Sequence, residues 1–90
     1  MVYKPYYCLI VTPSKILASV IGTHLESLGW KLVWTEKDIV TYQFKEDLIL
    51  TRFENSSITQ INYSTGYQLF KGECKSINEL KKIMSYLNIK

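Results

Sequence analysis

The most informative stretch of the chain is YYCLIVTPSKILASVIGTHLESLG, residues 6–29 of the 90. Its first part, Tyr6 to Val11, is an almost continuous run of apolar and β-prone residues. Such a run is typical of a strand that is buried on both faces. Thr12 and Pro13 then predict the start of a helix, because a hydroxyl side chain is a good N-cap and proline is tolerated in the first turn.

The helix that follows is predicted from one apolar stripe at helical spacing, formed by Ile16, Leu17, Val20, Ile21, Leu25 and Leu28. Gly29 comes directly after the stripe, and glycine readily adopts the left-handed conformation that ends many helices. The chain therefore opens with a strand followed by a helix.

After Gly29 the apolar period changes from that of a helix to that of a strand. Residues 30–35, 39–44 and 48–53 are rich in β-branched and aromatic side chains and are separated by short polar turns; residues 58–63 repeat the pattern, and 67–70 can form one more short strand. Connections this short predict a sequential antiparallel meander. The alternation assigns Trp30 and Trp34 to the buried face.

A second helix is predicted at the end of the sequence. Ser76 and Glu79 have the spacing of a capping box, and an apolar stripe follows, made by Ile77, Leu80, Ile83, Met84 and Leu87. The predicted order of elements is β-α-β-β-β-(β)-α. The simplest packing is a single α+β domain over residues 1–90, with one antiparallel sheet of four to five strands and two helices on one face.

Composition excludes several classes of protein. A hydrophobic fraction of 47% and a charged fraction of 21% exclude a wholly disordered chain. There is no apolar run of the roughly 18–20 residues that a membrane span needs, and no secretory signal, since Lys4 and Pro5 interrupt the start. Cys8 and Cys74 are far apart and lack metal-ligand spacing. We therefore expect a cytoplasmic protein without a membrane anchor.

Signs of catalysis and of cofactor binding are sparse in the sequence. The four glycines form no phosphate-binding motif, so we expect no cofactor. His24 is the only histidine of the sequence, and it lies on the stripe of the first predicted helix. It is therefore the one imidazole that could act in a small ribonuclease, which is the third function that we predict, after binding of a protein and binding of nucleic acid. Residues 25–33, LESLGWKLV, resemble the opening of HicA-type toxins, which are small ribonucleases. The histidine of that family is expected soon after this strand, where this chain has residues 36–39, EKDI.

The function favoured by the sequence is non-enzymatic binding of a protein. The outward face of the predicted sheet mixes apolar and small polar side chains, at Val33, Thr35, Ile39, Thr41 and Gln43. Tyr3 and Tyr6 lie near the start of the chain, and tyrosine is enriched at interfaces. We expect a regulator or inhibitor of a larger protein, or self-association into a homodimer, through this face or an edge strand.

Binding of nucleic acid is the alternative. The formal charge of +3 comes entirely from residues 71–90, because the first seventy residues hold six basic and six acidic side chains. The lysines that could contact phosphates are Lys71, Lys75, Lys81 and Lys82. A nucleic-acid surface needs several such cations on one strip.

Overall fold

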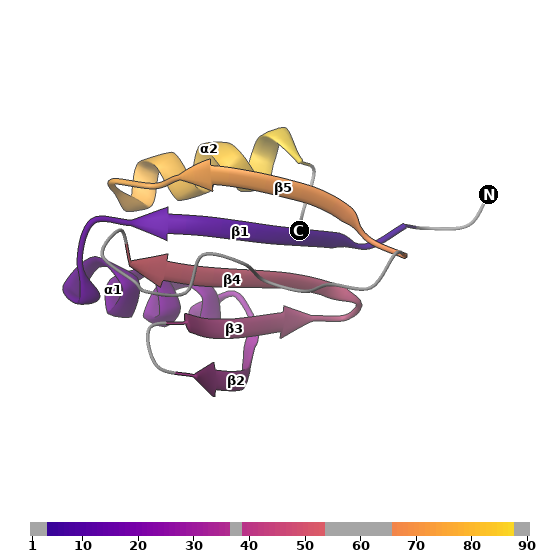
Figure 1. Ribbon diagram of the computed structural model, residues 1–90, viewed down its shortest axis with the longest axis horizontal. Helices are drawn as coiled ribbons and strands as arrows, with labels where there is room; N and C mark the ends of the chain where they lie inside the picture. Colours follow the sequence, from indigo (N-terminus) through magenta and orange to yellow (C-terminus); the bar gives the residue numbers. More distant parts are fainter. Residues whose placement is uncertain (1–3, 37–38, 54–65, 88–90) are drawn as a thin grey trace.

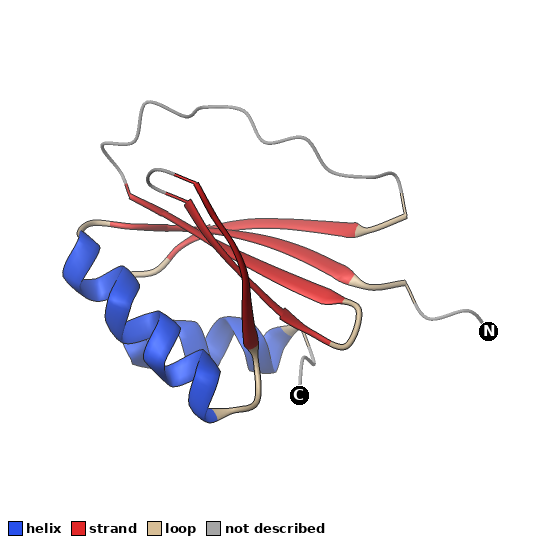
Figure 2. Ribbon diagram, turned by 90° about the horizontal axis from the view of Figure 1, so that it is seen from below, coloured by secondary structure: helices blue, strands red, loops and turns tan. Residues whose placement is uncertain are grey.

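The computed structural model of the chain describes residues 4–36, 39–53 and 66–87, and the statements below concern these residues. Five strands form one sheet, and both helices cover the same face of it (Figures 1 and 2). The elements are β1 (Tyr6–Thr12), α1 (Lys15–Ser27), β2 (Lys31–Glu36), β3 (Ile39–Phe44), β4 (Asp47–Phe53), β5 (Gln68–Glu73) and α2 (Ile77–Tyr86). The predicted α+β class with two helices is therefore confirmed. Neither helix, among the described residues, is long and apolar enough to cross a membrane.

The sheet is mixed, so the prediction of a wholly antiparallel sheet is wrong. The strand order is β2-β3-β4-β1-β5, in which β2, β3 and β4 form an antiparallel series. β1 lies between β4 and β5 and runs parallel to both (Figure 1). Parallel strands are buried on both faces, which agrees with the unbroken apolar run from Tyr7 to Val11.

The connection between β4 and β5 accounts for the difference. Because both strands are parallel to β1, the 14 residues between Phe53 and Gln68 link two strands of the same direction, which a tight hairpin cannot do. The predicted strand at 58–63 lies outside the described residues. The short strand predicted at 67–70 corresponds to β5, which begins one residue later and continues to Glu73.

Strand β1 contributes to apolar clusters on both faces of the sheet. On the helix face, Cys8 and Ile10 belong to the main core, whose other buried members are Ile21, Leu25, Trp30, Tyr42, Ile49, Cys74, Leu80, Met84 and Leu87. On the opposite face, here called the outer face, Tyr7 and Leu9 are buried with Ile39 and Leu50. The protein therefore has two core layers, one on each side of β1.

Each helix has an identifiable cap. The N-cap of α1 is Ser14 and not the predicted Thr12: the Ser14 Oγ accepts from the Leu17 N–H at 3.1 Å, while Thr12 is still paired in β1. The predicted C-terminal glycine is confirmed, since Gly29 has a φ of 97°. Its N–H donates to the Glu26 carbonyl, and the next N–H, that of Trp30, donates to the Leu25 carbonyl.

The predicted capping box of α2 is confirmed with one change. Ser76 is the N-cap, and its Oγ accepts from the Glu79 N–H at 3.2 Å. The Glu79 carboxylate accepts in turn from the N–H of Lys75, at 2.6 Å, one residue before the donor of the usual motif. Both reciprocal hydrogen bonds of the capping box are therefore formed.

Candidate functional site

Strand β2 is the most exposed element of the sheet. All six of its residues are exposed, and three consecutive ones are apolar: Leu32 is 51% exposed, Val33 48% and Trp34 59%. β2 is an edge strand, because β3 is its only neighbour in the described sheet. Its other edge therefore offers backbone N–H and C=O groups that no described strand occupies.

A β-bulge between Leu32 and Trp34 changes the faces that the side chains of β2 occupy. Leu32 lies opposite Tyr42, a residue of the helix-face core, whereas Trp34 lies opposite Thr41 on the outer face. The extra residue in the bulge is Val33. The bulge therefore moves Trp34 out of the core, where simple alternation had placed it.

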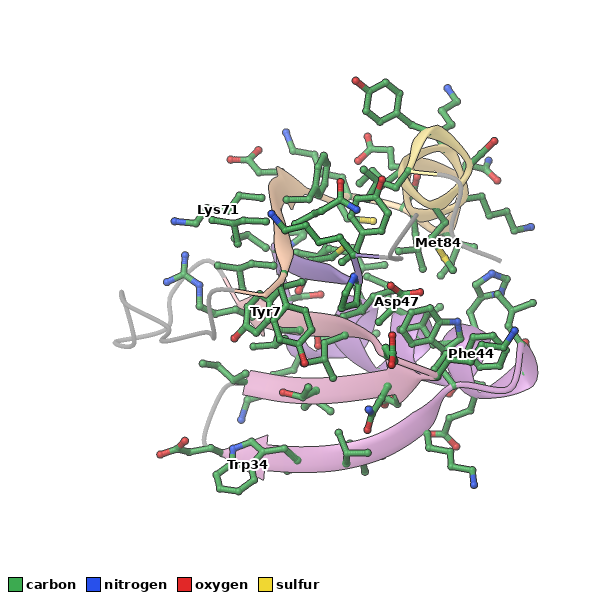
Figure 3. The ribbon with its side chains drawn as sticks, turned by 90° about the vertical axis from the view of Figure 1, so that its right-hand side faces the viewer. Tyr7, Trp34, Phe44, Asp47, Lys71 and Met84 are labelled. Atoms are coloured by element: carbon green, nitrogen blue, oxygen red, sulfur yellow. The ribbon has the colours of Figure 1, made fainter. Side chains whose placement is uncertain are left out.

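The same shift reverses the prediction for Thr35. It lies opposite Val40 and so is on the helix face, not on the outward face that was predicted. Figure 3 shows Trp34 at the free edge of the sheet, far from Met84 and α2. One signal for the bulge was present in the sequence: Leu32, Val33 and Trp34 are three consecutive apolar residues, which a regular one-sided strand does not place together.

Three other residues of the predicted protein-binding face contribute little accessible surface. Ile39 is only 6% exposed and Thr41 only 8%, within the outer core layer. Gln43 is half-buried, and its Nε2 donates to the Lys45 carbonyl at 3.0 Å. Of the five residues predicted for this face, Val33 and Thr35 are exposed, and Thr35 lies on the helix face.

Of Tyr3 and Tyr6, the tyrosines predicted as anchors, the structure describes Tyr6. Tyr6 is half-buried, and its backbone N–H donates to the Asp47 carboxylate at 2.8 Å. Tyr7 is buried and packs edge-on against the ring of Tyr67, with the ring centroids 5.8 Å apart. Tyr3 lies outside the described residues.

The four lysines of the nucleic-acid hypothesis do not form one strip. Lys71 is on the outer face of β5, opposite Leu9. Lys75 and Lys82 border a shallow hollow beside α2, but Glu73 and Glu79 line the same hollow together with Ile83. Lys81 directly precedes Lys82 on α2, so it is turned about 100° away around the helix axis, and it does not line the hollow. The basic side chains are therefore dispersed and partly offset by carboxylates.

The structure also shows the surroundings of the histidine, the cysteines and the acidic residues, which are the side chains that could act in catalysis or bind a metal. His24 is half-buried in the last turn of α1, where its backbone carbonyl accepts from the Ser27 hydroxyl at 2.6 Å. Within residues 4–36, 39–53 and 66–87, no group of three or more His, Cys, Asp or Glu side chains could hold a metal ion. Cys8 and Cys74 are both buried free thiols, and burial raises the pKa of each. Buried thiols with raised pKa values are poor nucleophiles.

Comparison of the chain with models of known protein families, with curated proteins and with solved structures finds no match in any of the three.

Proposed function

We propose that the chain is a small non-enzymatic protein-binding module that takes up an extended strand at the free edge of β2. The observation that supports the proposal is the exposure of all six residues of this strand, with three adjacent apolar side chains at its centre. Soluble proteins usually protect a sheet edge with charged side chains, proline or a bulge, or by covering it. β2 has a bulge and one charged residue at each end, but its three central side chains are apolar and exposed.

The chemistry of such a contact follows from the strand itself. An added strand gains main-chain hydrogen bonds along the edge, and side chains on alternate faces select its sequence. Leu32 offers an apolar contact on the helix face, and Trp34 offers one on the outer face. A partner strand with apolar residues on both faces would therefore be favoured. Such a contact would serve either a regulator or inhibitor of a larger protein, or self-association of the chain.

The dispersal of the lysines is the reason to rank nucleic-acid binding second. Phosphate contacts add up only when several cations follow one path along the backbone of the nucleic acid. Lys71 and Lys82 lie on different surfaces, and Glu79 lies next to Lys82 in the hollow. Titration of labelled DNA and RNA at two salt concentrations tests this alternative, and tight binding that is lost with salt would make it the leading function.

The proposed edge contact is tested by photo-crosslinking. A benzoylphenylalanine at Val33 should give one discrete crosslinked product in native extract, because Val33 lies at the centre of the free edge. The product should disappear when Leu32→Lys and Thr35→Lys are added, since lysines block edge pairing. Lysines placed at Ser85 and Tyr86, two exposed positions of α2, are the matched control and should leave the product intact. A product that survives the β2 lysines, or no product at all, would contradict the proposal.

A further inference from the structure

We infer that the strand accepted by β2 is β2 of a second copy of the chain, paired antiparallel with Lys31 opposite Glu36. The inference rests on the proposed function, because it names the occupant of the same edge. It is carried by the charge pattern of the strand, which is basic at its first residue and acidic at its last, with Leu32, Val33 and Trp34 between.

The bulge makes this register possible. Two copies related by a two-fold axis perpendicular to the sheet keep their faces, so residues placed opposite each other must come from the same face. Lys31 lies opposite Gln43, and Glu36 lies opposite Ile39; both partners are on the outer face. In a regular strand, residues five positions apart lie on opposite faces, and the bulge at Val33 removes this mismatch.

The remaining positions agree with the same register. Leu32 falls opposite Thr35 of the second copy, and both residues are on the helix face. At the centre, Val33 falls opposite Trp34 of the second copy. Because the arrangement is symmetric, each of these pairs occurs twice. The result is one continuous sheet through both copies, with both pairs of helices on the same face.

Strand β5 is the other edge of the sheet that the described strands form, and it provides a comparison with β2. It also has six residues, but its pairing with β1 is regular, without a bulge. Pairing all six residues with a second β5 would place Gln68, on the helix face, opposite Glu73, on the outer face. Residues from opposite faces of the sheet would then have to lie opposite each other, which the two-fold symmetry does not allow. Of the two edges, only β2 can pair with itself over its whole length.

The expected complex is reversible, because a six-residue edge buries less surface than a stable dimer interface usually does. Its assembly should depend on the two end pairs. Lys31→Glu places two carboxylates opposite each other at each end, and Glu36→Lys places two ammonium groups there. Either change should lower the association constant about tenfold or more, since both symmetric pairs change from attraction to repulsion.

The decisive experiment is sedimentation equilibrium of the wild-type chain, of each single variant and of their equimolar mixture. The wild type should associate to a dimer as concentration rises, and each variant alone should remain more monomeric. In the mixture, the new glutamate of the Lys31→Glu chain meets the new lysine of the Glu36→Lys chain, so heterodimers should form and native mass spectrometry should detect them. Thermal unfolding of each variant controls for the fold, because both positions are exposed.

The outcomes separate the two proposals. A wild type that stays monomeric up to about 1 mM would overturn the self-pairing, as would a mixture that associates no better than its components. If the Val33 crosslink then joins the chain to a different protein, the edge-binding function remains and only its occupant is wrong. A product with twice the mass of the chain supports both proposals, and no product at all contradicts both.

Discussion

The phenol ring of Tyr42, on β3, packs directly onto Gly22 in the middle of α1: a Cβ atom at Gly22 would lie 2.9 Å from the Tyr42 Cζ and nearer still to its hydroxyl oxygen. Gly22 is buried, and Tyr42 is only 7% exposed. Glycine normally weakens a helix interior, so its presence here is explained by the space that this ring needs.

We therefore predict that Gly22→Ala destabilises the protein by about 1–3 kcal/mol, in spite of the higher helix propensity of alanine. Urea unfolding monitored by circular dichroism measures the change. Gly66→Ala is the matched control, because a Cβ atom there would meet nothing within 4 Å. Equal stability of Gly22→Ala and the wild type would show that the ring moves away at no cost.

The two tryptophans should differ in fluorescence and in their contribution to stability. Trp30 is 2% exposed and packs against Phe44, with the ring centroids 5.7 Å apart, whereas Trp34 is 59% exposed. Trp30→Ala should cost about 3–5 kcal/mol, and Trp34→Ala should change stability by no more than about 0.5 kcal/mol. In Trp34→Phe the remaining emission should be blue-shifted and resistant to acrylamide; in Trp30→Phe it should be red-shifted and easily quenched.

The Trp30→Phe variant also reports on the proposed dimer. Trp34 falls beside Val33 of the second copy in the inferred register, so acrylamide quenching of Trp34 should decrease as the protein concentration rises. A quenching constant that does not change with concentration would contradict the pairing.

The free energy of unfolding should fall as the pH rises above about 9. Burial, and after it the charge of Asp47, raises the pKa of the Cys8 thiol from 9.0 to about 12. Between these values the thiol ionises in the unfolded chain but stays protonated in the fold, so the unfolded state binds fewer protons and is favoured by rising pH. Below pH 9 both states hold the proton, and this thiol adds no pH dependence.

Urea unfolding at about pH 8 and at about pH 10.5 measures this effect, with Cys8→Ala as the comparison. The variant has lower overall stability, so the quantity to compare is the change in unfolding free energy between the two pH values. That change should be smaller in the variant. It should not vanish, because burial also raises the pKa values of Tyr7, Tyr42 and Cys74. An identical change in both proteins would contradict the prediction.

The two serine caps should each contribute to stability. Ser14 accepts from the Leu17 N–H and Ser76 from the Glu79 N–H, and alanine at either position removes that bond. We expect a loss of about 0.5–2 kcal/mol for each substitution. Ser85→Ala, at an exposed position within α2, is the control and should be neutral. If both cap variants unfold at the wild-type urea concentration, the caps contribute nothing measurable.

The helices were predictable because their signals are local. The apolar stripe of α2, Gly29 and the Ser76 cap are recognised within a few residues, and each is found in the structure. The stripe predicted for α1 is only partly right: Ile21 and Leu25 are buried, whereas Ile16, Val20 and Leu28 are exposed. The first cap was misplaced by two residues because both Thr12 and Ser14 can cap a helix, and only the pairing of Thr12 with Phe53 in the sheet decides between them.

The sheet was less predictable because its arrangement depends on residues far apart in sequence. The buried character of β1 was visible in its continuous apolar run, but its two parallel neighbours were not, since no local pattern shows which strands will pair. The prediction of which side chains lie on the candidate binding face was the least accurate part. One extra residue, Val33, reverses the faces of Trp34 and Thr35, and strict alternation cannot anticipate it.

The central position of β1 has a consequence for how the chain folds. β1 is synthesised before the other four described strands, but Tyr7 pairs with Leu48 on one side and with Leu69 on the other, 41 and 62 residues later. The middle of the sheet therefore cannot close until most of the chain is present, and contacts over such distances slow folding. Until then an apolar strand has neither of its neighbours, so the growing chain is most exposed to aggregation before β4 and β5 emerge.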